Sequence, residues 1–185
     1  MGTMISSGAD VVAFLEGQHQ EIQALFNQVD ATEGDERKEA FHALRRLLAV
    51  HETAEEEIVH PVARRALPDG QIIIAARLKE ENEAKKVLAE LERLDLDSEE
   101  FETKFAAFAS SVILHAESEE QQEFERLGDQ LDQRRLQRMR DAVKIAESIA
   151  PTRPHAGVES AMANLLVGPF ASMLDRARDA LSGKS

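Results

Sequence analysis

The feature that most constrains this chain is a short motif that occurs twice, a histidine followed four residues later by a glutamate. The copies are His51–Glu55 and His115–Glu119, and 64 residues separate them. Residues four apart in an α-helix lie on the same face, so each pair can direct an imidazole and a carboxylate at one cation. Both pairs fall on apolar helix faces, where a charge is costly unless it is paired or bound to metal. The pattern therefore predicts two helical half-sites for metal.

Apolar residues recur at helical spacing along the chain, and turn signals separate the helical segments. Asp10 and Ser98 are candidate N-caps, Pro68-Asp69-Gly70 is a turn, and Gly128 is a candidate helix stop. No alternation of apolar and polar residues competes as a strand signal. Four long helices with short connections predict an all-α fold, an antiparallel up-down four-helix bundle. The expected helices cover residues 10–30, 35–66, 71–94 and 98–127.

The chain continues beyond this bundle, which we expect to occupy residues 10–127. A shorter, highly charged helix is expected over residues 130–149, within a connecting segment at 128–150. Residues 151–185 combine a proline-containing linker with a C-terminal amphipathic helix. The apolar face of that last helix needs cover. The cover comes either from the bundle or from a second copy of the chain, which would make a homodimer.

The composition limits the partners and the compartment. The net charge is −13, from 35 acidic and 22 basic residues, which disfavours nucleic acid and anionic membrane surfaces and attracts cations. Solubility alone would also explain such a charge. The chain has no cysteine, no run of 18 apolar residues and no secretory signal, so we expect a cytoplasmic protein. It also lacks tyrosine and tryptophan, so no redox chemistry can pass through a radical on either.

A second repeat links the first and third expected helices. The segment that begins at His19 aligns with the segment that begins at Glu81, 62 residues later, with a glutamate at the third position of both. The fourth, seventh and eighth positions are apolar in both segments. Glu81 therefore takes the place of His19 and shares the core side of its helix. The plain alternatives are a surface Glu81 paired with Arg77 or Lys85, and a core His19 that only makes a hydrogen bond.

Together these residues resemble the hemerythrin-like family of HHE cation-binding proteins over about residues 10–127. Leu15 before the first histidine and Phe124 after the last carboxylate match as well. The resemblance implies a four-helix bundle that holds two non-haem irons, with manganese or zinc as alternatives. It implies three terminal imidazoles and two bridging carboxylates, and the repeat adds one more carboxylate. The expected metal ligands are His19, His51, Glu55, Glu81, His115 and Glu119.

The chain departs from the oxygen-carrying members of that family on its third helix. Those proteins present two histidines four residues apart, where this chain has Glu81 and Lys85. A protonated lysine has no lone pair to donate. The expected shell of three imidazoles and three carboxylates favours the ferric state over reversible O₂ carriage. It also leaves an open position where water, O₂ or peroxide could bind.

Three functions remain open at this point. The first is a protein that binds O₂ or handles an oxidant such as peroxide or nitric oxide, with a catalase-like or peroxidase-like activity as its enzymatic form. The second is a module that senses or stores iron or oxygen without turnover and signals through the last helix. The third is a metal-free scaffold in which the His/Glu pairs are only hydrogen-bonded.

The neighbouring polar residues are expected to lie outside the site. His42 and His60 are each nine residues from His51, which is half a turn out of phase in an α-helix, so both should face away. A bend at His60-Pro61 would be the exception. Glu56 and Glu120 rotate off the ligand face and are expected at the solvent surface.

Overall fold

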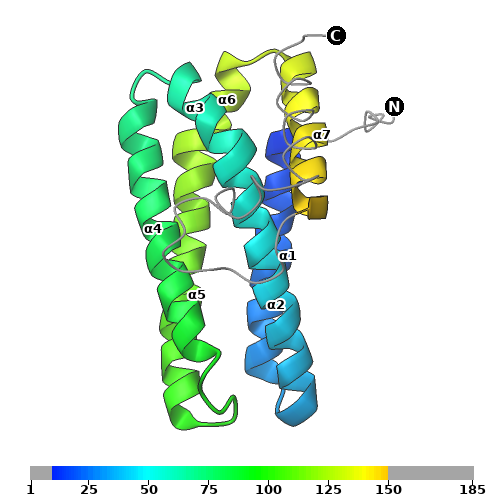
Figure 1. Cartoon of the computed structure of the whole chain (residues 1–185), viewed down its shortest axis with the longest axis vertical. Coiled ribbons are helices and arrows are strands. Elements are labelled where there is room, and N and C mark those ends of the chain that lie inside the picture. The colour runs from blue at the N-terminus through cyan, green and yellow to red at the C-terminus, as the bar shows by residue number, and fades with distance from the viewer. Residues whose placement is uncertain (1–9, 150–185) are drawn as a thin grey trace, which may run out of the picture.

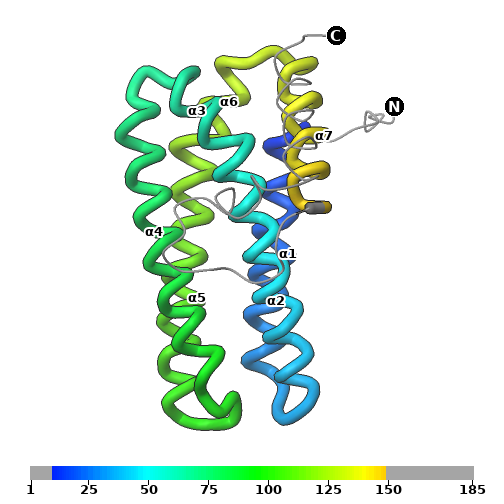
Figure 2. The backbone as a smooth tube through the Cα atoms, in the orientation of Figure 1, coloured from blue at the N-terminus to red at the C-terminus, as the bar shows by residue number. Residues whose placement is uncertain are grey.

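The computed structural model describes residues 10–149, and within that range every regular element is a helix (Figure 1). The helices form four long antiparallel rods, with α1 beside α2 and α4 beside α5 (Figures 1 and 2). The predicted all-α, up-down four-helix bundle is confirmed. The first two rods are α1 (Val11–Ala31) and α2 (Gly34–Ala54), which continues through η1 (Glu55–Val59) into α3 (His60–Ala66). The other two are α4 (Gly70–Leu91) and α5 (Glu99–Glu119), which continues through η2 (Glu120–Phe124) into α6 (Glu125–Gln130).

Two of the rods contain a π-helical turn that the sequence did not predict. In η1 the amide of His60 donates to the carbonyl of Glu55, five residues back. In η2 the amide of Glu125 donates to the carbonyl of Glu120 in the same way. Each turn accommodates one extra residue, so the helix beyond it is rotated by about 100° from an uninterrupted α-helix. The first π turn begins at the glutamate of one His-xxx-Glu motif, and the second begins one residue after the glutamate of the other.

The ends of the rods follow local rules, with one correction. Asp10 accepts from the amide of Ala13 and Ser98 from that of Phe101, as expected of N-caps. Gly128, however, does not stop its helix, because the amide of Leu131 still donates to the carbonyl of Leu127.

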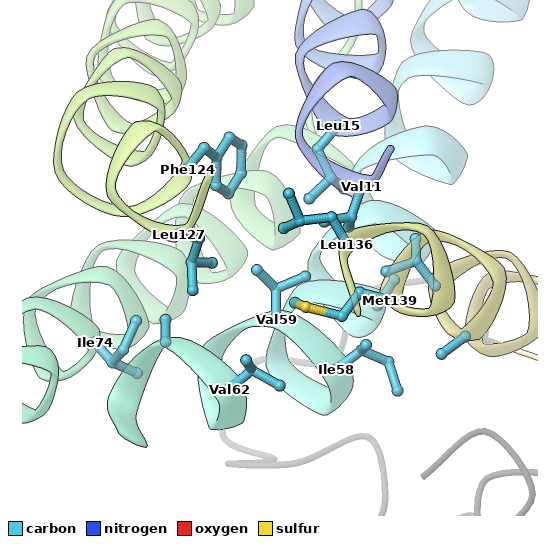
Figure 3. Packing of buried hydrophobic residues seen from close by; sticks show 14 of the residues in the cluster. Val11, Leu15, Ile58, Val59, Val62, Ile74, Phe124, Leu127, Leu136 and Met139 are labelled. Carbon is cyan, nitrogen blue, oxygen red and sulfur yellow. The ribbon is translucent and has the colours of Figure 1, made fainter. Parts of the chain in front are cut away.

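Two apolar clusters fill the bundle, one on each side of a polar layer. One cluster is rich in aromatic rings and includes Phe26, Phe41 and Phe105. The other surrounds Leu15 and Val59 (Figure 3). Along α1, the order Leu15, His19, Ile22 crosses from one cluster through the polar layer to the other.

The fifth helix, α7 (Gln133–Ile149), does more than connect segments. It packs along α1, α2 and η1, and Leu136 and Met139 lie fully within the cluster around Val59 (Figure 3). Gln18 on α1 also donates a hydrogen bond of 2.6 Å to Glu147. The segments expected at 151–157 and 158–181 lie outside the described residues. No helix in the described part of the chain is long and apolar enough to cross a membrane.

Candidate metal centre

The polar layer brings together the six residues that the sequence predicted as ligands. They come from α1, from the junction of α2 with η1, from α4 and from α5. Five of them are at least nine-tenths buried, and the side chain of His115 is 15% exposed. The predicted set, all of it in this layer, is His19, His51, Glu55, Glu81, His115 and Glu119.

Glu119 lies at the centre of the layer. Its Oε2 is 3.5 Å from His19 Nε2, and its Oε1 is 3.3 Å from His115 Nε2. One group of ligand atoms, all within 4.8 Å of one another, joins Glu119 to His19, His51 and Glu55. Another joins Glu119 to Glu81 and His115 by the same measure. These two groups define neighbouring cation positions that share the Glu119 carboxylate, and a third group joins Glu119 to His60 and Glu123.

Several atoms of this layer lack the partners that buried polar atoms normally have. Both carboxylate oxygens of Glu55 and of Glu119 are buried without a hydrogen bond among the described residues, as are Glu81 Oε2 and His115 Nε2. His19 Nε2 and His51 Nε2 are 3.1 Å apart, with both nitrogens directed into the same space. Imidazole nitrogens and carboxylate oxygens are suitable ligands for iron, manganese or zinc. The donor set therefore fits the metal pair that the resemblance implied.

Burial and neighbouring charges perturb the ionisation of these groups. Burial, followed by the charge of His19, lowers the pKa of His51 to about 3, so its imidazole is neutral and keeps a lone pair. Burial, followed by the charge of Glu119, raises the pKa of Glu55 well above its usual value. Burial alone would also raise the pKa of Glu119, but the nearby charge of His115 holds it well below normal. The ionisation of each group therefore depends on the charges of its neighbours in the layer.

An outer shell of acceptors orients the three predicted histidines. Nδ1 of His19 donates to Glu120 over 2.8 Å, Nδ1 of His51 to Gln18 over 2.9 Å, and Nδ1 of His115 to Glu80 over 2.8 Å. These bonds leave Nε2 of each ring free for the interior. Hydrogen bonds of this kind fix the ring and the tautomer of histidines that bind metal. Glu120, expected to be only solvated, therefore has a positioning role.

Lys85 lies among carboxylates at the edge of the polar layer. Its ammonium forms an ion pair with Glu56. It also lies 3.6 Å from Glu52 Oε2 and 4.0 Å from Glu81 Oε2. The expectation of a solvated Glu56 was wrong, because only 9% of that side chain is exposed. Glu56 lies four residues after the buried Glu52, on the helix face that meets Lys85 of α4. Lys85 thus neutralises carboxylates at the edge of the layer.

The expectation that His60 faces away was wrong as well. His60 is 1% exposed, with its Nε2 2.7 Å from Glu81 Oε1 and its Nδ1 3.0 Å from Glu123 Oε1. The extra residue in η1 turns His60 by about 100° and brings it to the side of the polar layer. Glu123, which is fully buried, was not foreseen either. His42, which has no π turn between it and His51, is exposed as expected.

A cavity of about 730 Å³ connects this layer with the surface. Its walls come from α1, α2, α4 and α5, and they include the exposed residues Gln20 and Lys79. His19, His51 and His115 also line it. Small molecules therefore have a route to the imidazoles of the polar layer.

Comparison with known proteins agrees with this site. The model of the hemerythrin HHE cation-binding domain matches residues 10–127. Among solved structures, the chain is similar to a hemerythrin HHE cation binding domain-containing protein from Mycobacterium kansasii, with a TM-score of 0.67 and 17% identity. That alignment covers 91% of this chain and 99% of the other. The comparison with curated proteins gives no match. Since the family model spans well over half of the sequence, this chain belongs to the hemerythrin HHE cation-binding family and is a metal-binding, hemerythrin-like protein.

Proposed function

We propose that this protein holds two non-haem irons and binds O₂, or consumes an oxidant such as peroxide or nitric oxide. The observation that carries the proposal is the pair of ligand groups that share Glu119. Each group contains imidazole and carboxylate donors, and several of these donors have no other partner in the described part of the chain.

The donor set supports iron over the alternatives. Three imidazoles with three carboxylates form a mixed and anionic shell that stabilises ferric ions, although manganese and zinc accept the same donors. When bound, an iron pair would exchange electrons with O₂, peroxide or nitric oxide. The histidines hold their Nε2 atoms in place through Glu120, Gln18 and Glu80, so the donors are oriented before any cation arrives.

The surroundings of the site support reaction with a small oxidant. The cavity reaches three imidazoles from the surface, which gives such a molecule a path. The sequence contains no tyrosine or tryptophan, whose side chains can form radicals, and no cysteine, whose thiol is readily oxidised. The same absence of cysteine supports a cytoplasmic location.

The test begins with metal-free protein that is loaded with Fe²⁺ under anaerobic conditions. Elemental analysis should give two irons per chain, and exposure to O₂ should produce oxo-to-iron charge-transfer bands. The iron-loaded protein should then consume added hydrogen peroxide or, in a separate experiment, added nitric oxide. Glu119→Gln should lose iron and activity together, whereas His42→Gln, an exposed histidine of α2, should retain both.

The outcomes separate the alternatives. Protein that takes up no iron would contradict the di-iron proposal. Protein that takes up two irons but consumes neither peroxide nor nitric oxide and does not bind O₂ would contradict oxidant handling and leave a storage module.

A further inference from the structure

The most informative residue that the family resemblance leaves unassigned is His60. It lies at the start of α3, directly after the π turn, and it is almost completely buried. Both of its ring nitrogens contact buried carboxylates. We propose that His60 is a fourth imidazole ligand, which binds through Nε2 at the metal position of Glu81 and Glu119. This inference rests on the proposed metal centre.

The first argument is that His60 follows the same pattern as the three predicted histidines. In those three, Nδ1 donates to an outer acceptor while Nε2 faces the interior. In His60, Nδ1 lies 3.0 Å from Glu123 Oε1, and Nε2 lies 2.7 Å from Glu81 Oε1. Glu123 would therefore orient the ring of His60 as Glu120 orients that of His19.

The second argument comes from the spacing of the donor atoms. Two ligand atoms that each lie about 2.1 Å from one ion are about 3 Å apart at right angles and about 4 Å apart across the ion. His60 Nε2 is 2.7 Å from Glu81 Oε1 and 4.0 Å from Glu119 Oε1. For comparison, His51 Nε2 is 3.3 Å from Glu55 Oε2, and these two residues form the first His-xxx-Glu motif. His60 has the spacing of a ligand.

The third argument is the balance of the two positions. His19 and His51 serve one position, with Glu55 and a share of Glu119. Without His60, the other position has only one imidazole, that of His115. His60 is grouped with Glu119 and Glu123 and also contacts Glu81, so it can supply this position with a second imidazole. The imidazole that α4 lacks at Lys85 is then supplied by the far end of the second rod, and the π turn is what brings it there.

The decisive measurement is the protonation of His60 in metal-loaded protein. We would label the histidines with ¹⁵N, load the full chain with Zn²⁺, which is diamagnetic, and record long-range ¹H–¹⁵N correlations. As a ligand, His60 has an unprotonated Nε2 with the shift of a metal-bound nitrogen, while Nδ1 keeps its proton on Glu123. As a core histidine, it keeps a proton on Nε2 that is directed at Glu81. The second result would overturn the inference.

Substitution gives an independent readout. His60→Gln identifies the His60 signals, and it should weaken the second equivalent of Zn²⁺ by more than the 10- to 100-fold typical of an outer-shell change. His42→Gln should bind as wild type does. Unchanged binding of both equivalents by His60→Gln would also refute the ligand role. If His60→Gln does not fold, the wild-type spectrum still decides.

The failure of the inference is distinguishable from the failure of the proposed function. Wild-type protein that binds two ions while His60 keeps both ring protons would refute this ligand and leave the metal centre intact. Wild-type protein that binds neither Zn²⁺ nor Fe²⁺ would refute the centre itself.

Discussion

Replacing Glu55 with leucine should change stability in opposite directions with and without metal. Glu55 is fully buried at the start of η1, and neither of its carboxylate oxygens makes a hydrogen bond to the rest of the described structure. An unpaired buried polar atom costs about 1–3 kcal/mol. Its chain neighbours Ala54, Ile58 and Val59 are buried and apolar, so a leucine side chain would be compatible there.

The magnitude follows from these contacts. Replacing this unpaired buried carboxylate with an apolar group of similar volume should recover about 1–3 kcal/mol. We therefore expect metal-free Glu55→Leu to unfold at a higher temperature than wild type, by about 2–4 °C for each kcal/mol. A cation at a thousand times its Kd stabilises wild type by about 4 kcal/mol, and the variant should gain much less. The order of stability should then reverse.

The assay is thermal unfolding followed by circular dichroism, first with a chelator and then with Zn²⁺ or with anaerobic Fe²⁺. Glu39→Leu, an exposed glutamate of α2, is the matched control and should stay within about 0.5 kcal/mol in both conditions. A metal-free Glu55→Leu less stable than wild type would show that this carboxylate is paired. An equal gain from metal in both proteins would show that it is not a ligand.

Further predictions concern the surroundings of the site. Metal-free protein should lose stability as pH rises from about 6.5 to 8. Burial raises the pKa of Glu52 to about 8. Burial alone would lower the pKa of His115, but the charge of Glu119 outweighs it and raises that pKa to about 10. Both groups bind protons in the folded state that the unfolded chain releases, so a urea midpoint that rises over this range would contradict the assignment. Lys85→Met should destabilise by about 3 kcal/mol in urea unfolding, since it leaves buried carboxylates without their cation; a change below 1 kcal/mol would refute this. Gly70→Ala should cost about 1–3 kcal/mol, because its Cβ would lie 2.5 Å from a carbonyl oxygen of α3. Gly128→Ala, where a Cβ meets nothing within 4 Å inside a helix, should instead gain up to about 1 kcal/mol; the same sign for both glycines in thermal unfolding would contradict the argument.

The polar layer could be predicted because its charged and imidazole side chains lie on otherwise apolar helix faces. A histidine and a glutamate four residues apart on an apolar face have few stable interpretations, and the repeat of the motif removed most of the rest. Glu81 followed from the same repeat, since its helix aligned with that of His19. The rods themselves followed from helical spacing and from caps such as Asp10 and Ser98.

His60 could not be placed, because a π turn shifts the helical phase by one residue and leaves little trace in the sequence. Phase is normally read from an apolar stripe with a polar opposite face. Here α7 packs against η1, so Ile58, Val59, Val62 and Ala63 are all buried, and the apolar residues fit either phase. The cost of the π turn is offset by contacts between distant elements, which a local pattern does not contain.

The packing of α7 shows that the end of the family model and the end of the apolar core are different points in the chain. The family model ends at residue 127, and all six predicted ligands lie before that point. Yet Leu136 and Met139 occupy the interior beside Val59, as integral parts of the same apolar core. A protein that ended at residue 127 would retain all six predicted ligands. It would, however, expose to water the apolar residues that α7 covers. The segment that the family model matches is therefore shorter than the unit that shares this apolar core.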